Sequence, residues 1–149
     1  MTGQQTITAY LIADKAADAI DFYIKAFGAK ETGARIAGPD GKIGHAELTI
    51  GGDSFYLADE FPDMGARSPK SLGGSPVMFT LQVADVDSAM KQAADAGAEV
   101  TRAAEDQFYG ERSGHVLDPF GYRWALSQHI EDVPPEELKR RAAALYGET

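Results

Sequence analysis

The residues best placed for chemistry are His45 and Glu47, which stand two positions apart in a segment that alternates polar and apolar side chains. Residues two apart on a β-strand point to the same side of the sheet, so the imidazole and the carboxylate would share one face. Such a pair can transfer protons or supply two ligands to a metal ion. The structural alternative is a strand-end histidine bonded to backbone and a glutamate paired with an arginine.

Further polar side chains follow the same alternation on other apolar segments. Thr80 and Gln82 share one such segment, Arg123 lies on another, and Tyr10 lies near the start of the chain. We expect these side chains to line a cup formed by a curled sheet, which is the setting that a small-molecule site needs. The alternative is a polar sheet face that meets only solvent.

An internal repeat organises the segments that carry these residues. Helical periodicity over residues 16–27 ends at Gly28, and a second helical run over residues 86–96 ends at Gly97. An aspartate before each run is suited to capping the helix N-terminus, and the glycine after it is suited to the left-handed C′ position. His115 is the repeat equivalent of His45, so the second half of the chain repeats the strand pattern of the first.

Each half therefore reads as β-α-β-β-β, and the sequence predicts an α+β protein of two tandem modules. The first module covers residues 6–60 and the second covers residues 77–129, and a loop rich in Gly, Pro and Ser joins them. Residues 133–146, which begin with prolines, predict an added C-terminal helix. We expect the 149 residues to form a single domain of this kind.

Composition excludes several classes of protein. The net charge is −9 and the pI is near 4.7, so nucleic acids and anionic membrane surfaces are not expected partners. The chain has no cysteine, which rules out disulfides, thiolate nucleophiles and cysteine-based metal sites. No apolar run approaches the ~20 residues of a membrane span, and the first residues do not resemble a signal peptide. The composition predicts a soluble, cytoplasmic protein.

The chain resembles a known family at several of these segments. The helix sequence Ala19–Tyr23, its end at Gly28 and the turn Asp118–Trp124 are similar to those of the glyoxalase, bleomycin-resistance and dioxygenase superfamily, also called vicinal oxygen chelate proteins. The resemblance implies a glyoxalase/bleomycin-resistance fold, in which two modules form a curled mixed-sheet cup, and a homodimer. A closer similarity, to the PhnB-like branch, lies in residues 38–48, 57–60, 73–76 and 105–112.

The resemblance also allows a test for the family's metal site. Metal-dependent members place His, Gln or Glu at one inward position on the first and last strands of each module, and the matching positions here are Thr8, about Leu57, Met78 and Ala125. None of these is an imidazole or a carboxylate, so three or four strong donors cannot converge there. We expect no metal at the family position and no cofactor. A relocated metal site around His45 and Glu47 stays an alternative.

The loop before the seventh expected strand supplies the remaining candidates. In this family the loop closes over the cup, so Arg112 could bind a carboxylate of the ligand, and its alternative is an ion pair with Glu105, Asp106 or Glu111. Phe108 and Tyr109 could form an aromatic lid or anchor a dimer interface. For Arg123, the alternative is a pair with Glu47.

The sequence thus favours a protein that binds a small molecule in the sheet cup without the usual family metal. The alternative is an enzyme, either a lyase, isomerase or dioxygenase with a relocated metal or an acid–base catalyst that uses Glu47 and His45; the sequence leaves open whether the protein is an enzyme. The predicted ligand-binding residues are Tyr10, His45, Glu47, Thr80, Gln82, Phe108, Tyr109, Arg112 and Arg123.

Overall fold

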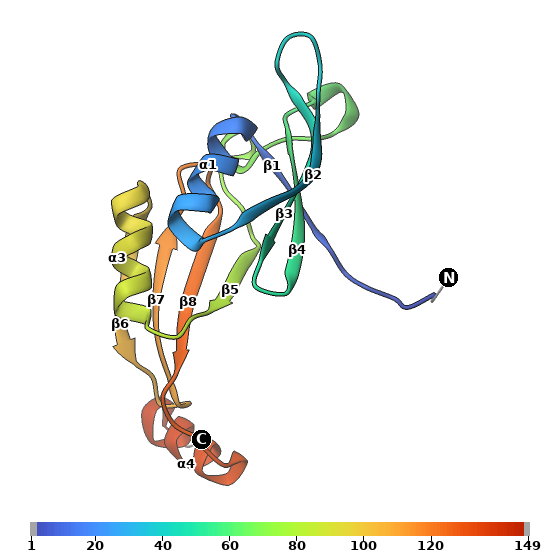
Figure 1. The fold of residues 1–149 in the computed structure, drawn as a ribbon. Helices are drawn as coiled ribbons and strands as arrows, with labels where there is room; N and C mark the ends of the chain where they lie inside the picture. Colours follow the sequence, from blue (N-terminus) through green and yellow to red (C-terminus); the bar gives the residue numbers. More distant parts are fainter. Residues whose placement is uncertain (1–2, 148–149) are drawn as a thin grey trace.

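The chain folds as two copies of one β-α-β-β-β unit followed by a separate helix (Figure 1). The computed structural model describes residues 3–147. The first unit contains β1 (Ala9–Ala13), α1 (Ala16–Phe27), β2 (Lys30–Ala37), β3 (Ile43–Ile50) and β4 (Asp53–Asp59). The second contains β5 (Met78–Gln82), α3 (Val86–Ala96), β6 (Glu99–Asp106), β7 (Glu111–Leu117) and β8 (Arg123–His129). The connection holds the short helices η1 (Pro62–Met64) and α2 (Pro69–Leu72), and α4 (Pro135–Tyr146) follows β8.

Each unit forms its own four-stranded mixed sheet. The strand orders are β1-β4-β3-β2 and β5-β8-β7-β6. Each sheet has one parallel pair, β1 with β4 in the first and β5 with β8 in the second, and its other pairs are antiparallel. β1 and β5 are therefore edge strands, and neither pairs with a strand of the other sheet among the described residues. The predicted α+β class, the tandem repeat and the C-terminal helix are confirmed.

Helix α1 has the predicted bounds, but the predicted cap at its N-terminus is wrong. Asp14 makes no capping bond, and its buried Oδ1 atom has no hydrogen-bond partner in the described chain. The distant Asp59 takes over this role: its carboxylate accepts from the backbone N–H of Ala16 at 2.8 Å and from that of Ile43 at 2.7 Å. Asp59 is 9% exposed, so both of these bonds lie in the interior.

Helix α3 has the predicted bounds and the predicted aspartate cap at its N-terminus. The Asp85 side chain accepts from the backbone N–H of Ser88 at 3.1 Å, which satisfies one of the free donors at the helix start. Gly97 follows the last turn with a φ of 121°, a conformation that strains any residue with a Cβ. The equivalent residue after α1, Gly28, has a φ of 69° in the left-handed region.

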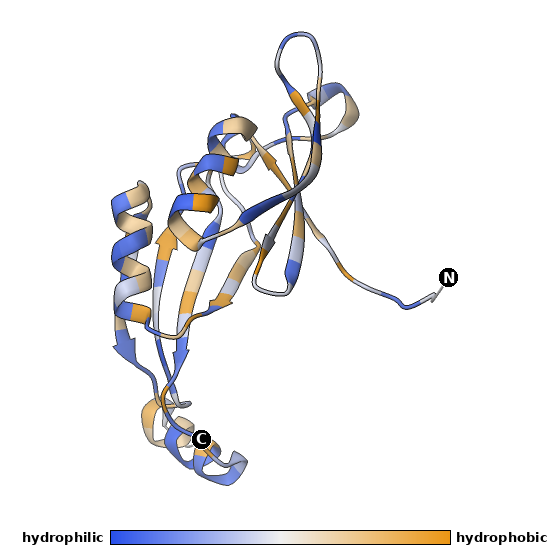
Figure 2. Ribbon diagram, viewed as in Figure 1, coloured by the Kyte–Doolittle hydropathy of each residue, from blue (hydrophilic) through white to orange (hydrophobic). Residues whose placement is uncertain are grey.

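The apolar core lies between the two helices and the sheet faces turned towards them. Tyr23, Leu11, Leu48 and Leu126 are fully buried there, and Trp124 is 5% exposed, as its position on the apolar side of its strand predicts. Figure 2 shows apolar residues along the strands and hydrophilic residues on the outer turns of α3. The two sheets thus share one helical layer, while their opposite faces carry the polar residues.

A buried carboxylate joins the two units where α1 and α3 pack side by side. Asp118, in the turn between β7 and β8, is 2% exposed and accepts from the Tyr23 hydroxyl at 2.5 Å and from the Trp124 indole N–H at 2.9 Å. It also accepts from the backbone N–H groups of Phe120 and Tyr122. Burial raises the pKa of Asp118, and these hydrogen bonds oppose that rise.

Replacement of Asp118 by alanine should destabilise the fold strongly. The change leaves several buried donors without an acceptor, and each such group costs about 1–3 kcal/mol, so we expect a loss of at least about 3 kcal/mol in the free energy of unfolding. Tyr23→Phe removes one of the bonds and should cost about 1 kcal/mol. Urea denaturation followed by circular dichroism measures both.

The matched control is Asp95→Ala, which removes an exposed carboxylate of α3 that pairs with Lys91. Surface changes of this kind usually stay within about 0.5 kcal/mol. A loss for Asp118→Ala no larger than that for Asp95→Ala would contradict the role given to Asp118.

Candidate functional site

The polar residues predicted to line a cup lie on the sheet faces turned away from α1 and α3, which we call the open faces. On the first sheet, the pairing register aligns Tyr10 with Tyr56 and Tyr56 with Glu47, so these three side chains form one row. Residues directly opposite each other on paired strands point to the same side. His45 lies two positions before Glu47 on the same face.

Tyr10, His45 and Glu47 are in direct contact there. The Tyr10 hydroxyl lies 2.7 Å from Nδ1 of His45, and Nε2 of His45 lies 3.3 Å from Oε2 of Glu47. In the tautomer with its proton on Nε2, His45 accepts from Tyr10 and donates to Glu47, so both bonds are satisfied at once. The Tyr56 ring lies within 5.6 Å of the Tyr10 ring and 5.0 Å of the imidazole, between centroids. The prediction that His45 and Glu47 share a face is thus met by a connected polar cluster.

The state of Tyr10 follows from its surroundings. Partial burial raises the pKa of its phenol, so the hydroxyl keeps its proton at neutral pH. The same hydroxyl lies 3.3 Å from the carbonyl oxygen of Gly44, which gives it a second acceptor. Since Tyr10 is 48% exposed, its oxygen can still reach a bound molecule.

The open face of the second sheet has a floor of small side chains. Ser113, Ala125 and Ser127 are each less than 9% exposed although they point away from the helices. Longer side chains surround them: Thr80, Gln82, Arg102, His115 and Arg123 lie on this face by the pairing register. The predicted residues Thr80, Gln82 and Arg123 are exposed here, as the strand alternation requires.

Arg123 and Glu47 do not meet within one chain. They lie on different sheets, and no ion pair of Arg123 is present among the described residues. The intrachain pairing considered for these two groups is therefore not what the structure shows.

Arg112 lies on the side of its sheet that faces the helices. Its guanidinium pairs with Asp87 of α3 at 3.1 Å and with Asp106 at 3.0 Å, and both contacts raise its pKa. The placement over the open face expected from the sequence is thus wrong, because Glu111 and Ser113 occupy the open face and Arg112 alternates with them. This geometry favours the ion-pair alternative for Arg112.

Phe108 and Tyr109 lie beside the C-terminal helix, a contact that the sequence did not indicate. The Phe108 ring packs edge to face on Tyr146 with centroids 6.0 Å apart, and its carbonyl accepts from Arg141 at 3.0 Å. Tyr109 is 44% exposed. Neither ring covers the Tyr10–His45–Glu47 cluster within the described chain.

His129 lies at the far end of the second sheet, away from His45. It contacts Glu111 at 2.7 Å and Asp132 at 2.6 Å, and so joins β7 to the segment that leads into α4. The hydrogen bond to Glu111, followed by that to Asp132, raises the pKa of His129. The hydrogen bond between His129 and Glu111 also lowers the pKa of the Glu111 carboxyl.

The residues at the family's metal positions do not fit a metal ion. Thr8, Met78 and Ala125 lie on exposed edges or on an open face, and none is a strong ligand for a divalent ion. The fourth position, taken as about Leu57, is 0% exposed in the core, so this placement was wrong and its neighbours Tyr56 and Ala58 face the open side. Within residues 3–147, no three His, Cys, Asp or Glu side chains are grouped to hold a metal ion.

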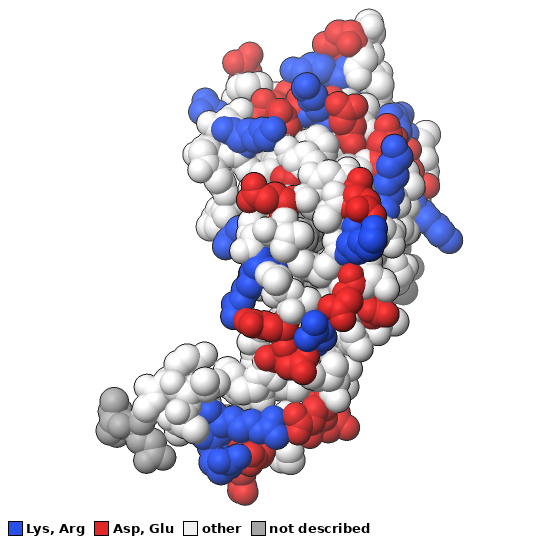
Figure 3. All heavy atoms as spheres, turned by 90° about the vertical axis from the view of Figure 1, so that its left-hand side faces the viewer, with Lys and Arg blue, Asp and Glu red and all other residues white. Residues whose placement is uncertain are grey.

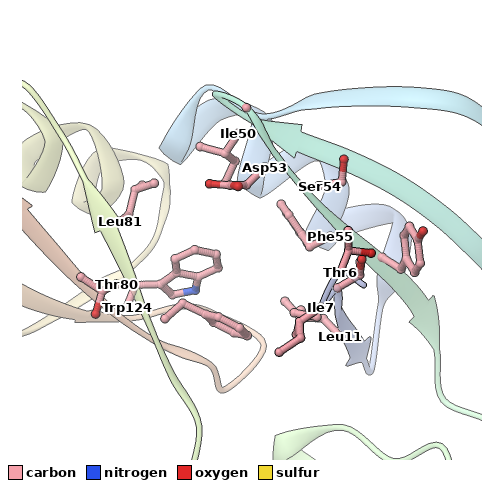
Figure 4. Close-up of a pocket in the computed structure, with 15 residues that line it drawn as sticks. Thr6, Ile7, Leu11, Ile50, Asp53, Ser54, Phe55, Thr80, Leu81 and Trp124 are labelled. Carbon is pink, nitrogen blue, oxygen red and sulfur yellow. The ribbon is translucent and has the colours of Figure 1, made fainter. Parts of the chain in front are cut away.

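A cleft of about 600 Å³ lies between the two sheets, at the edge strands β1 and β5 (Figure 4). One wall carries Leu11, Ile50 and Phe55, and the other carries Leu81 and Trp124. Thr80 reaches its rim from the second open face. The sequence did not reveal this cleft, because its apolar residues alternate along the strands just as core residues do. The pattern does not show which of them line the space between the two sheets.

Charges on the side of the molecule that carries α3 are mixed in sign. Figure 3 shows basic and acidic groups interspersed over this side and on α4. Several of them form pairs, such as Lys91 with Asp95 and Arg140 with Glu137. Among the described helices, none is long and apolar enough to cross a membrane.

Comparison with known proteins places these features in a wider group. Residues 5–126 match the sequence model of the Glyoxalase/Bleomycin resistance protein/Dioxygenase superfamily. An uncharacterised protein of Mycobacterium bovis is 48% identical over 139 residues, which cover 91% of each chain. An uncharacterised protein of Arabidopsis thaliana is 35% identical over 122 residues, which cover 78% of this chain and 73% of that protein.

Solved structures share the fold. The X-ray structure of an Arabidopsis thaliana gene product has a TM-score of 0.66 at 31% identity and covers 83% of this chain and 98% of its own. TioX from a Micromonospora species has a TM-score of 0.63 at 21% identity and covers 87% of this chain and all of its own, a likeness of fold alone.

The contacts of His129 lead to a prediction about pH. Since its folded pKa is raised above the unfolded value of 6.5, the contact with Glu111 and Asp132 should be strongest below pH 6.5 and weaken as pH rises through the folded pKa. NMR titration of the imidazole should give a pKa above 6.5, and Glu111→Gln should bring it down. In the same spectra His115 should titrate below 6.5, since its pKa is lowered mainly by burial. A His129 pKa at or below 6.5 would contradict the contact.

Proposed function

Because the chain belongs to the glyoxalase/bleomycin resistance protein/dioxygenase superfamily, we propose that it binds a small molecule on the open faces of its sheets, without the metal site of metal-dependent members. The observation that carries this proposal is the connected cluster of Tyr10, His45 and Glu47 on the first open face. A solvated sheet face has no need of such a cluster, whereas a binding site uses a few convergent polar groups to orient its ligand.

The cluster offers a ligand both donors and acceptors on an aromatic wall. Glu47 keeps one carboxylate oxygen free of the contact with His45, and the Tyr10 and Tyr56 rings provide flat apolar surface beside it. Thr80 and Gln82 on the second open face add neutral polar groups. This combination suits a small molecule that carries a planar or aromatic part and several polar atoms.

We also propose that the protein works as a homodimer, in which the second copy covers the cleft between the two sheets at the edge strands β1 and β5. The edge strands β1 and β5 leave backbone groups unpaired, which favours pairing with another chain. Apolar side chains stay exposed at these edges: Ile7 is 100% and Val77 is 51% exposed. A second copy would bury this surface and bring further polar groups to the open faces.

A second function, proton transfer without a metal, has specific support from the same cluster. The Tyr10 oxygen could take a proton from a bound substrate while its own proton passes to Nδ1 of His45. The imidazolium formed in this step would be stabilised by the carboxylate of Glu47. The two proposals share one site and differ in whether the bound molecule is changed.

We also propose that the chain belongs to the PhnB-like branch of the superfamily and that the protein is cytoplasmic. The segments at residues 38–48 and 105–112 support the PhnB-like branch of the superfamily. The cytoplasmic location expected from the composition stays a prediction.

A thermal-shift screen of a metabolite library should find ligands that stabilise the protein, and loss of one polar contact should weaken them. For a ligand found in this way, Tyr10→Phe and His45→Gln should each raise the Kd about tenfold, the effect of about 1.4 kcal/mol. Isothermal titration calorimetry measures the change. Tyr146→Phe, an exposed tyrosine of α4, is the matched control and should leave the Kd unchanged. Equal affinity of all variants would remove the cluster from the site.

Glu47→Ala separates binding from proton transfer. The bound molecule is followed by proton NMR in D₂O, where an enzyme of this kind replaces a carbon-bound proton by deuterium. If the protein is an enzyme, Glu47→Ala should abolish exchange even at ligand concentrations that saturate the variant. If it only binds, the wild type should show no exchange above the rate in buffer.

The dimer can be tested at the edge strands. Sedimentation velocity of the wild type should give a dimer, and Val77→Glu should shift it towards monomer because a charge would be buried at the interface. Leu72→Glu, at an exposed position of α2, serves as control. A monomeric wild type would rule out this proposal.

A further inference from the structure

The open face of the second sheet carries a group of cationic and proton-donating side chains that the proposed function has not used. Arg102 lies directly opposite His115 in the β6–β7 pairing, and His115 lies opposite Ala125 in the β7–β8 pairing. Arg123 lies two positions before Ala125 on the same face, diagonal to His115. Three positively charged or protonatable groups thus surround one small residue.

The small residue leaves room between them. Ala125 ends at Cβ, while the neighbouring Thr80, directly opposite it on β5, presents a hydroxyl at the same level. The floor continues into Ser127 and Ser113, both buried. Arginine, imidazole and hydroxyl groups around such a floor match the oxygen atoms of an anionic group.

Two of these groups, His115 and Arg123, make no polar side-chain contact within the described chain. Among the described residues His115 makes no side-chain hydrogen bond and Arg123 no ion pair, while Arg102 makes one contact, at 3.2 Å to the exposed Glu105. Arg123 thus differs from Arg35, Arg102, Arg112, Arg140 and Arg141, each of which pairs with a carboxylate.

The charges act on His115 in the expected direction. Burial first, and then the positive charges of Arg102 and Arg123, lower the pKa of its imidazole. The acidic groups on the same face are Glu99 and Glu105 on the outer strand β6, and Glu111 at the start of β7, where it contacts His129 at 2.7 Å. The centre of the face therefore has a local excess of positive charge in a protein whose net charge is −9.

We propose that Arg123, His115 and Arg102, with Thr80, form a subsite for an oxyanion of carboxylate size, so that the molecule bound by this protein carries such a group. This inference rests on the proposed function and names the chemical class of its ligand. The anionic group lies over Ala125, and the rest of the ligand extends towards the Gln82 side of the face.

The test uses benzoate as the probe and benzamide as its neutral counterpart. The chain has three histidines, so each imidazole can be followed by NMR and assigned by single His→Gln variants. Benzoate should shift the His115 resonances in a saturable way and raise its pKa, because an anion favours the imidazolium. Binding should strengthen as pH falls through the pKa of His115, while the carboxylate stays ionised.

Two variants of equal charge change decide the outcome. Arg123→Gln should raise the Kd for benzoate at least tenfold, while Arg67→Gln, an exposed arginine in the connecting loop, should leave it unchanged. Equal effects of the two variants, or equal shifts by benzamide and benzoate, would overturn the subsite. If benzoate perturbs His45 but not His115, the anion subsite is wrong while the binding function proposed for the first open face survives.

Discussion

The buried carboxylate of Asp118 is the interaction on which the arrangement of the two halves depends. A carboxylate can stay in the interior only when its oxygens accept enough hydrogen bonds, and here the donors come from both repeats: Tyr23 of α1, Trp124 of β8 and two backbone groups of its own turn. The network fixes how α1 lies against the second sheet. Because each sheet packs one face against these helices, strand alternation leaves its polar residues on the opposite, open face.

Local sequence patterns predicted the bounds of the helices well, but not the contacts that helices make with residues distant in the sequence. The bounds of α1 and α3 follow from periodicity and a closing glycine, both of which are readable within a few residues. The cap of α1 was not readable, because Asp59 comes from the end of β4 and reaches back to Ala16 through the tertiary fold. The same holds for Phe108, whose partner on α4 is defined only by where the tail folds back.

The site divides in the same way. Strand alternation placed Tyr10, His45 and Glu47 on one face, and their contact then needs only the strand pairing that brings β1 and β3 to either side of β4. The predicted position of Arg112 was wrong because a residue in a loop cannot be assigned to a sheet face until the pairing register of β7 is known. That register puts Glu111 on the open face. The cleft between the two sheets was not predicted, for a different reason. Leu81 and Phe55 alternate along their strands as core residues do, and they line an opening only because the two sheets are separate.

The two open faces differ in chemistry, and this difference bears on how a ligand could use both. The first presents a carboxylate with a tyrosine and an imidazole, and the second presents two arginines and another imidazole. Opposite charges attract most where water is excluded, yet Glu47 and Arg123 remain apart on separate sheets of one chain. Each face therefore keeps an unsatisfied charge that a ligand, or the complementary face of a second copy, can neutralise. A molecule with a donor at one end and an oxyanion at the other would satisfy both faces, provided that the assembly brings them within its length.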